Sequence, residues 1–404
     1  KENKKGAAVD MSPMASFRRG RTQVLSPNGE LAAFIRDHNL WVRNVETKKE
    51  RQLTFDGIED YGYATNNAGW TKGPGPVVLW SPDSKKIATF QHDSRGTGEM
   101  YMVSTKSGHP ELSQWKYPLP GDSLIFRISR VIINVKDASM VRLNMPPDQH
   151  RSTSSDHIAG RGGTFLDVRW SKDAKQLAFV SSSRDHKEAQ LRVANTKTGD
   201  VRDVMKEVQK TYFESGDGFS NWHYLAKTNE VIWFSERDNW GHLYLIDIKT
   251  GKIKNRITKG EWAVQQVRYV DQKKRKIYFS AGGKDPGDPY YWHYYSINMD
   301  GSGLKLLTPE YAHHTVTFSP KYKYFVDSYS TPVTPPVIVL RDMDGNQLVK
   351  LEQADISRLL ASGWQPPTLT KTKARDGVTD IFGLMYKPTK FNPNRKYPVL
   401  NPLY

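Results

Sequence analysis

The feature that most constrains the fold of this chain is a pattern of short strands and turns that occurs six times. One copy begins WSPDSKKIATF at Trp80, where a Ser/Asp/Lys turn precedes a short run of apolar and β-branched residues. Runs such as KKIATF and RKIYFS, bounded by turn formers, indicate strands rather than helices. The copies are spaced by about 45–55 residues, with one longer interval, and they begin at Leu25, Trp80, Trp170, Tyr224, Tyr269 and Phe318.

Each copy predicts a small antiparallel sheet. The KTG and MDG motifs put Gly where a two-residue hairpin turn requires a positive φ. One such sheet cannot bury both of its faces, so the copies must stack on one another. The spacing favours an all-β fold, a β-propeller of four-stranded antiparallel blades, and an array of β-sandwiches is the alternative. The interval from Val131 to Phe165 predicts one further, irregular blade or half blade, with a polar surface loop inside it.

The pattern changes after about Glu352. The stretch QADISRLLASGW predicts a helix near Asp355 to Ser362, because its apolar residues share one face and Gly363 follows its end. The text after it predicts a hairpin, LTKTKARDGVTDIFGLMYKP, and a buried strand, YPVLNPLY. The predicted domains are therefore an N-terminal extension over residues 1–24, a β-propeller over residues 25–352, and the start of another domain over residues 353–404.

Composition limits the function classes. The chain has 404 residues and no cysteine, which excludes disulfides and thiolate metal sites. Its net charge of +16 suggests either an anionic partner or solvated loops, and the lysines favour loops because they occur in turn-like pairs such as DSKK and QKKRK. We therefore expect no nucleic-acid partner. No stretch approaches the roughly 18 apolar residues of a membrane span.

The other candidate motifs favour structural roles. His313 and His314 are adjacent, so on a strand they point to opposite faces and lack a partner set for a metal ion. GRGGTF and SRGTGEM do not have the strand–turn–helix setting of a nucleotide site. The aromatic cluster from Asp285 to Tyr295 favours packing between blades over contact with a peptide. We expect no metal and no cofactor.

With these residues in view, the chain resembles the prolyl oligopeptidase superfamily, in its dipeptidyl peptidase IV branch. The resemblance covers most of the chain and rests on three stretches: GIEDYGY leading to VVLWSPDSKKIATFQHD, SERDNWGHLYLIDIKTGKIKNRITKGEW, and DGVTDIFGLMYKPTKFNPNRKYPVLNPLY. It implies an eight-bladed N-terminal propeller that covers a C-terminal α/β-hydrolase domain. It also implies a serine peptidase that cuts after proline or alanine near the N-termini of peptides.

The first departure from that family concerns the catalytic domain. No G-x-S-x-G nucleophile elbow occurs in the 404 residues, and the family's Ser, Asp and His would lie beyond the last residue. Tyr404 aligns with the family tyrosine whose hydroxyl helps to form the oxyanion hole. We therefore expect this chain alone to be inactive, with only the truncated start of the hydrolase domain present and one or two blades missing before Lys1.

The second departure lies in the segment that binds the substrate amine in the family. The pattern Gly-Ile-x-Asp-aromatic-x-Tyr is present from Gly57 to Tyr63, but Ala64, Thr65 and Asn66 stand where the family has three glutamates. A free amino group is a cation that carboxylates fix by charge-assisted hydrogen bonds. Weaker substrate recognition could come from Glu59, Asn66 or Asn67, and the alternative is a simple loop with an Asn-Asn turn.

The resemblance predicts that the chain is the substrate-gating propeller of a dipeptidyl-peptidase-IV-like serine peptidase that acts on small, proline-containing peptides. The alternative is a free-standing propeller that binds a protein or peptide partner without catalysis. The expected partners are a peptide substrate, the missing catalytic domain and, as an open possibility, a second copy of the chain. A periplasmic or secreted location is expected, with the signal peptide outside the chain, and the cytoplasm stays open.

Overall fold

A computed structural model describes residues 22–65, 73–105, 107–149, 159–160, 164–165, 167–214 and 221–401. These residues form thirty-one strands and one short helix, so the prediction of an all-β chain is confirmed. The chain divides into two compact units, and each is described by itself. The first comprises Lys1–Asn239 and Leu243–Asn255, and the second comprises Trp240–His242 and Arg256–Tyr404, in each case for the described residues.

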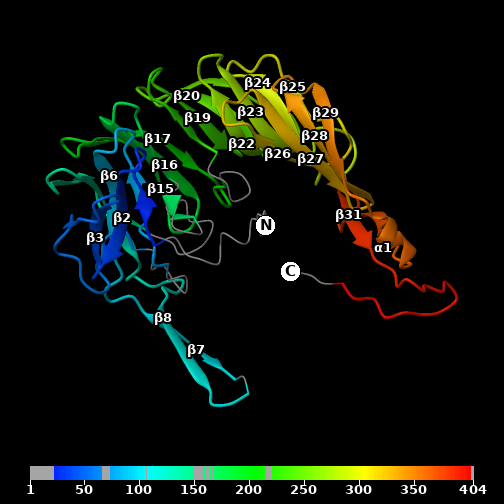
Figure 1. Cartoon of the computed structure of the whole chain (residues 1–404), viewed down its shortest axis with the longest axis horizontal. Coiled ribbons are helices and arrows are strands. Elements are labelled where there is room, and N and C mark those ends of the chain that lie inside the picture. The colour runs from blue at the N-terminus through cyan, green and yellow to red at the C-terminus, as the bar shows by residue number, and fades with distance from the viewer. Residues whose placement is uncertain are drawn as a thin grey trace, which may run out of the picture. The chain divides into compact units, whose positions relative to one another are not determined.

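Four antiparallel sheets make up most of the first unit (Figure 1). The first sheet has the order β1-β2-β3-β4, with strands β1 (Val24–Leu25), β2 (Leu31–Arg36), β3 (Asn39–Asn44) and β4 (Glu50–Gln52). The second has the order β10-β9-β6-β5, with β11 also paired to β9, and contains β5 (Leu79–Trp80), β6 (Lys86–Asp93), β9 (Arg127–Asn134), β10 (Met140–Arg142) and β11 (Asp148–Gln149).

In the next two sheets, as in the first, the strands lie side by side in the order in which they follow along the chain. The third contains β14 (Val168–Trp170), β15 (Gln176–Ser182), β16 (Glu188–Asn195) and β17 (Val201–Val208). The fourth contains β18 (His223–Leu225), β19 (Glu230–Ser235), β20 (His242–Asp247) and β21 (Ile253–Arg256). Two hairpins stand apart from these sheets, namely β7 (Glu99–Ser104) with β8 (Glu111–Lys116) and β12 (Ala159–Gly160) with β13 (Thr164–Phe165).

The second unit has two more four-stranded sheets and a short C-terminal region. The fifth sheet contains β22 (Ala263–Asp271), β23 (Lys276–Gly282), β24 (Trp292–Asn298) and β25 (Lys305–Leu306). The sixth contains β26 (His313–Phe318), β27 (Tyr324–Thr331), β28 (Thr334–Asp342) and β29 (Gln347–Gln353). The helix α1 (Ser357–Ala361) and the hairpin of β30 (Thr368–Lys373) with β31 (Asp380–Met385) follow.

The repeated Ser/Asp turn is a defined hydrogen-bonded structure. In the second sheet, the Ser81 hydroxyl donates to the Asp83 carboxylate at 2.6 Å and accepts the Lys86 N–H at 2.9 Å. Ser84 takes a positive φ of 60°, which closes the turn. Ser171 and Asp173 repeat both contacts before β15. Each turn supplies its own backbone partners, which is why the motif could be recognised in the sequence.

A threonine after the last strand of three sheets closes the sheet from its outer edge. Thr54 accepts the Leu40 N–H at 2.9 Å and donates to the Asn39 side chain at 3.0 Å. In the fifth sheet Thr308 accepts the Tyr294 N–H at 2.9 Å. Thr258 follows β21 in the same way and contacts the ring of His242, whose Nδ1 lies 3.0 Å from the threonine oxygen. The three threonine hydroxyls are buried, and these contacts give them the hydrogen-bond partners that buried polar groups need.

Clusters of buried apolar side chains join neighbouring sheets within each unit, as stacking of the repeats predicts. Each large side chain buried in this way contributes about 1.5–3 kcal/mol. The clusters pair Leu40 and Val42 with Trp80 and Ile133, Phe90 and Ile132 with Leu177 and Phe179, Leu191 and Val193 with Trp233 and Ile246, and, in the second unit, Tyr278 and Tyr294 with Val316 and Phe325.

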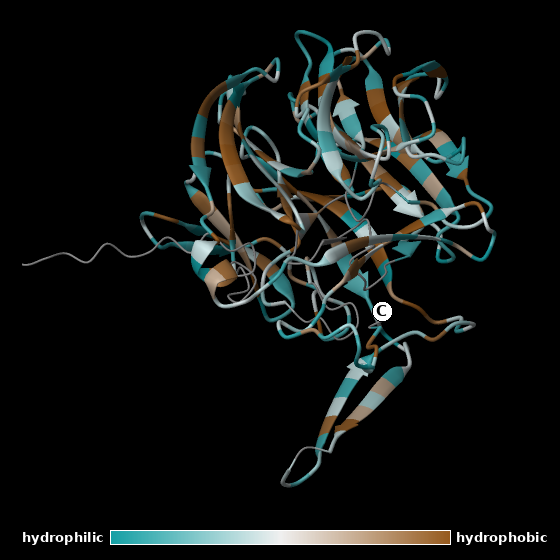
Figure 2. Cartoon of the chain, turned by 90° about the vertical axis from the view of Figure 1, so that its right-hand side faces the viewer, coloured by the Kyte–Doolittle hydropathy of each residue, from teal (hydrophilic) through white to brown (hydrophobic). Residues whose placement is uncertain are grey.

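The interval from Val131 to Phe165, for which the sequence predicts one further irregular blade or half blade, contains the end of the second sheet and the two-stranded sheet of β12 with β13. Strand β6 pairs with β9, not with β7, and β9 and β10 complete the sheet that begins at Leu79. The pair β7–β8 is an insertion that projects from this sheet in both views (Figures 1 and 2). The insertion separates the second strand of the repeat from the third, which lengthened the interval in the sequence.

The C-terminal predictions have mixed outcomes. The helix lies at Ser357–Ala361, inside the predicted stretch, and β30 pairs with β31 as the predicted hairpin. Tyr397 to Asn401 form no strand, and Val399 and Leu400 are 89% and 90% exposed. A strand buried on both faces needs neighbouring strands and covering helices, and the described residues supply none at this position. The predicted buried strand is therefore not formed here.

Candidate functional site

The segment Gly57–Thr65, which we call the lip segment, is held by backbone hydrogen bonds from two sheets. Tyr63 N donates to His38 O at 2.8 Å, in the turn between β2 and β3. Ala64 N donates to Phe90 O at 2.9 Å, and Val77 N donates to Ala64 O at 2.8 Å. The segment thus continues the edge of the second sheet beyond β5, at the end where β6 finishes.

Ala64, the first of the three positions where the family has glutamates, belongs to the core. Its side chain is fully buried in the cluster that contains Leu40 and Trp80, and its φ is +56°. Thr65 is also buried, and its hydroxyl has no hydrogen-bond partner within the described part of the chain. A glutamate at position 64 would bury a charge, so position 64 cannot face a ligand while this backbone path is kept.

Of the predicted site residues, the structure describes Glu59. Glu59 lies in the lip segment and is exposed. Asn66, Asn67 and Tyr404 lie outside the described residues. Glu59 is therefore the one predicted site residue for which the structure gives a position, and it is separated from Ala64 by the anchored residues Asp60 to Tyr63.

A network of side-chain hydrogen bonds that the sequence did not indicate holds Tyr63 of the lip segment in place. The Tyr63 hydroxyl donates to the Asp56 carboxylate at 2.8 Å, and Arg142 donates to Gln91 Oε1 at 2.7 Å and to the Tyr63 oxygen at 3.4 Å. Burial, and then the hydrogen bond to Asp56, raises the pKa of Tyr63 well above its ordinary value. Tyr63 therefore remains a neutral donor, and the matched tyrosine of the motif acts as an anchor.

Asp60 ties the lip segment to the base of the β7–β8 hairpin. Its Oδ2 lies 2.8 Å from Lys116 Nζ, and its Oδ1 accepts the Ser94 hydroxyl at 3.0 Å. The Arg95 guanidinium stacks 3.9 Å from the centre of the Tyr61 ring. The sequence motif named Asp60 and Tyr61, but Ser94, Arg95 and Lys116 gave no signal of their own because they belong to the insertion and its edges.

The aromatic cluster of the second unit is mainly a packing feature. Tyr291, Tyr294 and Tyr295 are buried, and only Tyr290 among its tyrosines is strongly exposed. The Tyr295 hydroxyl donates to the Asp285 carboxylate, and burial followed by this hydrogen bond raises the pKa of Tyr295 above its ordinary value. Tyr290 instead meets the Phe382 ring of β31 edge-on. The preference for packing over peptide contact is thus consistent with these positions.

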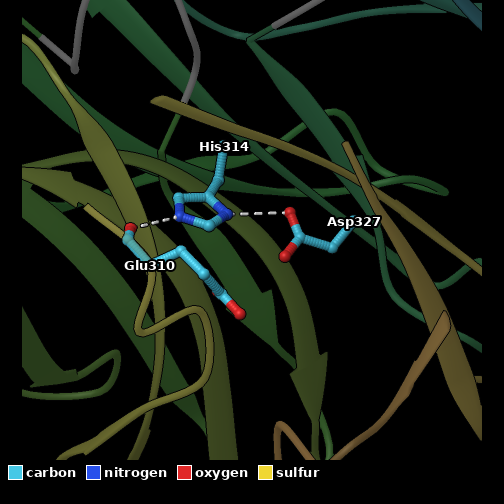
Figure 3. A group of neighbouring side chains, drawn as sticks. All are labelled: Glu310, His314 and Asp327. Carbon is cyan, nitrogen blue, oxygen red and sulfur yellow. Dashed lines mark hydrogen bonds and ion pairs between the residues drawn. The ribbon is translucent and has the colours of Figure 1, made fainter. Parts of the chain in front are cut away.

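One group of side chains in the second unit has the composition of a metal site, namely Glu310, His314 and Asp327 (Figure 3). His314 Nδ1 lies 2.9 Å from Asp327 Oδ1, and its Nε2 lies 2.9 Å from the backbone oxygen of Glu310. Arg341 donates to Asp327 Oδ2 at 3.0 Å and to both carboxylate oxygens of Glu310 at 2.6 Å.

This arrangement is an ion-pair network rather than a metal centre. The Glu310 carbonyl oxygen can only accept a hydrogen bond, so it occupies the Nε2–H of His314, while the Nδ1 side is taken up by the Asp327 carboxylate. Arg341 pairs with both carboxylates. The buried charges of Arg341 and Asp327 are therefore paired and hydrogen-bonded, which is what burial of charged side chains requires.

Comparison with known proteins shows what the chain is similar to. Residues 12–336 match the family model of the dipeptidyl peptidase IV (DPP IV) N-terminal region. Dipeptidyl-aminopeptidase B of Aspergillus niger is 26% identical over 430 residues, which cover 98% of this chain and 46% of that protein. The crystal structure of Porphyromonas gingivalis dipeptidyl peptidase 4 superposes with a TM-score of 0.74 at 23% identity, covering 93% of this chain and 51% of that one.

The chain spans about half the length of the relatives that it matches. At 23% sequence identity, the similarity to the Porphyromonas gingivalis structure shows the fold. Among the described residues, no helix has the length and apolar character needed to cross a bilayer.

Proposed function

We propose, because this chain belongs to the dipeptidyl peptidase IV N-terminal region family, that it is the substrate-gating propeller of a serine peptidase acting on small, proline-containing peptides. The Aspergillus niger relative is a dipeptidyl-aminopeptidase, a name that describes release of dipeptides from peptide N-termini. The propeller would admit short peptides and exclude folded proteins by size.

The observation that carries the proposal is the lip segment. Its motif residues Asp60 and Tyr63 are anchored by side-chain contacts, and Tyr63 and Ala64 by backbone bonds to His38 and Phe90. Such anchoring is expected where a short segment must present a ligand-binding group in a defined position. A plain connecting loop would not need four such contacts at three residues.

The C-terminal residues support the presence of a further domain in the working protein. Large apolar side chains are exposed along β29, α1 and β31 and beyond, a pattern that calls for a covering surface. They include Leu348, Leu351, Leu359, Leu360, Leu384, Met385, Val399 and Leu400. A hydrolase domain that follows this region would supply that cover, together with the nucleophilic serine, its histidine base and the aspartate.

In that enzyme the serine would attack the carbonyl of the scissile peptide bond while histidine takes its proton. The Tyr404 hydroxyl would donate to the oxyanion that forms. This chain would contribute the amine subsite through Glu59, Asn66 or Asn67. Because Ala64 is a core residue, recognition would rest on a smaller set of polar groups than three adjacent carboxylates provide.

Location and assembly extend the same proposal. Relatives that trim peptides support a secreted or periplasmic location, where peptide substrates are found. A homodimer is supported by the β7–β8 hairpin, which projects from its sheet and exposes Tyr101, Met102, Val103 and Leu112 (Figure 2). The relatives named above are described as peptidases, so they do not favour the alternative of a free-standing propeller without catalysis.

The test uses a longer chain that contains these 404 residues and continues beyond them. We expect it to release p-nitroaniline from Gly-Pro-p-nitroanilide, to react with a fluorophosphonate probe, and to leave intact a folded protein with an exposed N-terminal Gly-Pro. Cleavage of the folded protein at the same kcat/KM as of a decapeptide would refute gating. Absence of both turnover and probe labelling in a folded sample would refute the peptidase assignment.

A further inference from the structure

The lip segment and the base of the projecting hairpin share one residue, Asp60. Asp60 has a φ of +63°, at the centre of a tight turn in which Ile58 pairs with Tyr61. Its backbone oxygen accepts the Ser94 N–H at 2.8 Å. Its carboxylate binds the Ser94 hydroxyl and the Lys116 ammonium, as described above. The backbone oxygen and both carboxylate oxygens of Asp60 therefore contact residues of the hairpin base.

The hairpin base is in turn well supported. Lys116, the last residue of β8, also donates to Ser94 O at 3.2 Å. Tyr117 N donates to Gly98 O at 2.8 Å, which closes the base of the insertion. Arg184, between β15 and β16, donates to the backbone oxygens of Leu119 and Asp122 in the segment that follows the hairpin. The insertion is thus attached to the third sheet as well as to the lip segment.

A second contact acts in parallel with Asp60. Arg95 binds Asp93 through two hydrogen bonds, of 3.0 and 2.8 Å, which hold its guanidinium plane over the Tyr61 ring. Neighbouring residues of the lip segment therefore contact neighbouring residues of the hairpin base. A shift of the hairpin base has to move the lip segment or break both contacts.

We propose that Asp60 is a positioning residue that couples the hairpin to the lip segment, so that the state of the hairpin sets the position of the lip segment, Gly57–Thr65. The proposal rests on the proposed function in one respect, namely that the lip segment lies where the substrate amine binds. The coupling itself is a property of this chain. Restraint of the hairpin would order the lip segment, and displacement of the hairpin would loosen it.

The burial of the pair sets the expected size of the effect. The side chains of Lys116 and Asp60 are 23% and 35% exposed, so water competes for both. Partly exposed ion pairs of this kind contribute up to about 1 kcal/mol, so they shift the equilibrium between ordered and loosened lip segment without fixing it in one state. Loss of the pair should therefore raise about fivefold the population of molecules in which the backbone hydrogen bonds of the lip segment are broken.

The test measures amide hydrogen exchange of the 404-residue chain, so it does not depend on catalysis. The variants are Lys116→Met, which keeps the side-chain stem, and Asp60→Asn, which tolerates the positive φ and keeps an acceptor for Ser94. Lys116→Arg is the conservative variant that should restore the pair. Glu99→Gln is the matched control, because Glu99 is opposite Lys116 in the hairpin but binds only Tyr101 and Gln114.

We expect the amides of Tyr61, Tyr63 and Ala64 to exchange about fivefold faster in Lys116→Met and in Asp60→Asn, with no further increase in the double variant. Lys116→Arg and Glu99→Gln should stay within twofold of the parent chain, and amides in β15 and β16 should not change. The proposal is overturned if these three amides are unaffected by Lys116→Met, if Glu99→Gln accelerates them equally, or if Lys116→Arg fails to restore them.

Because this readout concerns exchange alone, a failed peptidase assignment leaves its outcome intact, and a failed coupling leaves the peptidase assignment intact. If both hold, Lys116→Met in the longer, active chain should raise KM about fivefold with kcat retained. That split is expected of a residue that positions a binding group and does not touch the reacting atoms.

Discussion

Arg130 in β9 donates from its Nε to the Asp148 carboxylate in β11 at a distance of 2.7 Å, and both side chains are buried. The same carboxylate oxygen accepts the Ser181 hydroxyl from β15 at 2.8 Å. Arg130 also donates to Val180 O at 3.2 Å and lies over the Phe179 ring. One buried ion pair therefore joins the second sheet to the third.

Asp148→Asn should lower the free energy of unfolding by about 3–5 kcal/mol, because it leaves the Arg130 charge buried without its counterion. Chemical denaturation of the two chains measures the difference. Asp203→Asn is the control, since Asp203 is an exposed partner of Arg192, and should cost less than about 1 kcal/mol. Equal effects of the two changes would show that the buried pair does not join the sheets.

Thr54→Val should destabilise the first sheet by about 1–3 kcal/mol, because it removes the acceptor for the buried Leu40 N–H. Thr54→Ser keeps the hydroxyl and removes one methyl group, so it should cost about 0.8 kcal/mol. Denaturation midpoints of the two variants give the comparison. A larger loss for the serine variant would mean that methyl packing, and not the hydrogen bond, explains the recurring threonine.

Ala64→Glu should destabilise the chain by several kcal/mol, because the side chain at position 64 lies in the core between the first two sheets. Ala64→Gly should change stability by less than about 1 kcal/mol, since the positive φ favours glycine while the lost methyl group disfavours it. Thermal unfolding of both variants tests the point. A well-tolerated glutamate would show that the backbone can turn position 64 outward.

Acid should destabilise the chain through His223. Burial, and then the nearby Arg169, lowers the pKa of His223 from 6.5 to about 4. The imidazole takes up a proton in the unfolded chain at higher pH than in the folded chain. Stability is therefore fully present above about pH 6.5 and falls as the pH drops towards 4, by a few kcal/mol at most.

His223→Asn should remove that part of the pH dependence. The measurement is the free energy of unfolding at pH 7 and at pH 4.5 for both chains, together with the NMR titration of the His223 ring. An unchanged pH dependence in His223→Asn, or a ring that titrates near 6.5, would contradict the predicted direction of the pKa shift.

If the proposed peptidase function holds, a free substrate amine should matter little to the longer chain. A carboxylate–ammonium contact contributes about 1.5–3 kcal/mol, and a neutral hydrogen bond about 1 kcal/mol. Ala64, Thr65 and Asn66 carry no charge, so we expect kcat/KM for a free and an N-acetylated substrate to differ by less than about tenfold. A preference above about a hundredfold that Glu59→Gln abolishes would show that Glu59 supplies the missing charge.

Local chemistry made much of this fold predictable from the sequence. The Ser81–Asp83 and Ser171–Asp173 turns, the helix at Ser357–Ala361 and the β30–β31 hairpin all depend on residues close together in the chain. Such elements follow from turn and capping chemistry and from strand periodicity, which a single sequence carries. The resemblance then indicated the family, because its motifs combine several of these local patterns.

Tertiary structure alone decided which strands pair across the insertion and which side chains meet at the lip segment. Strand β9 is mostly buried and β7 is mostly exposed, in keeping with the pairing of β9, and not β7, with β6. Asp60 and Ser94 meet although 34 residues separate them. Ala64 faces the core although a glutamate stands at its position in the family. The alternation of a strand specifies two faces, but the stacking of the sheets determines which face is buried and which distant residues come into contact.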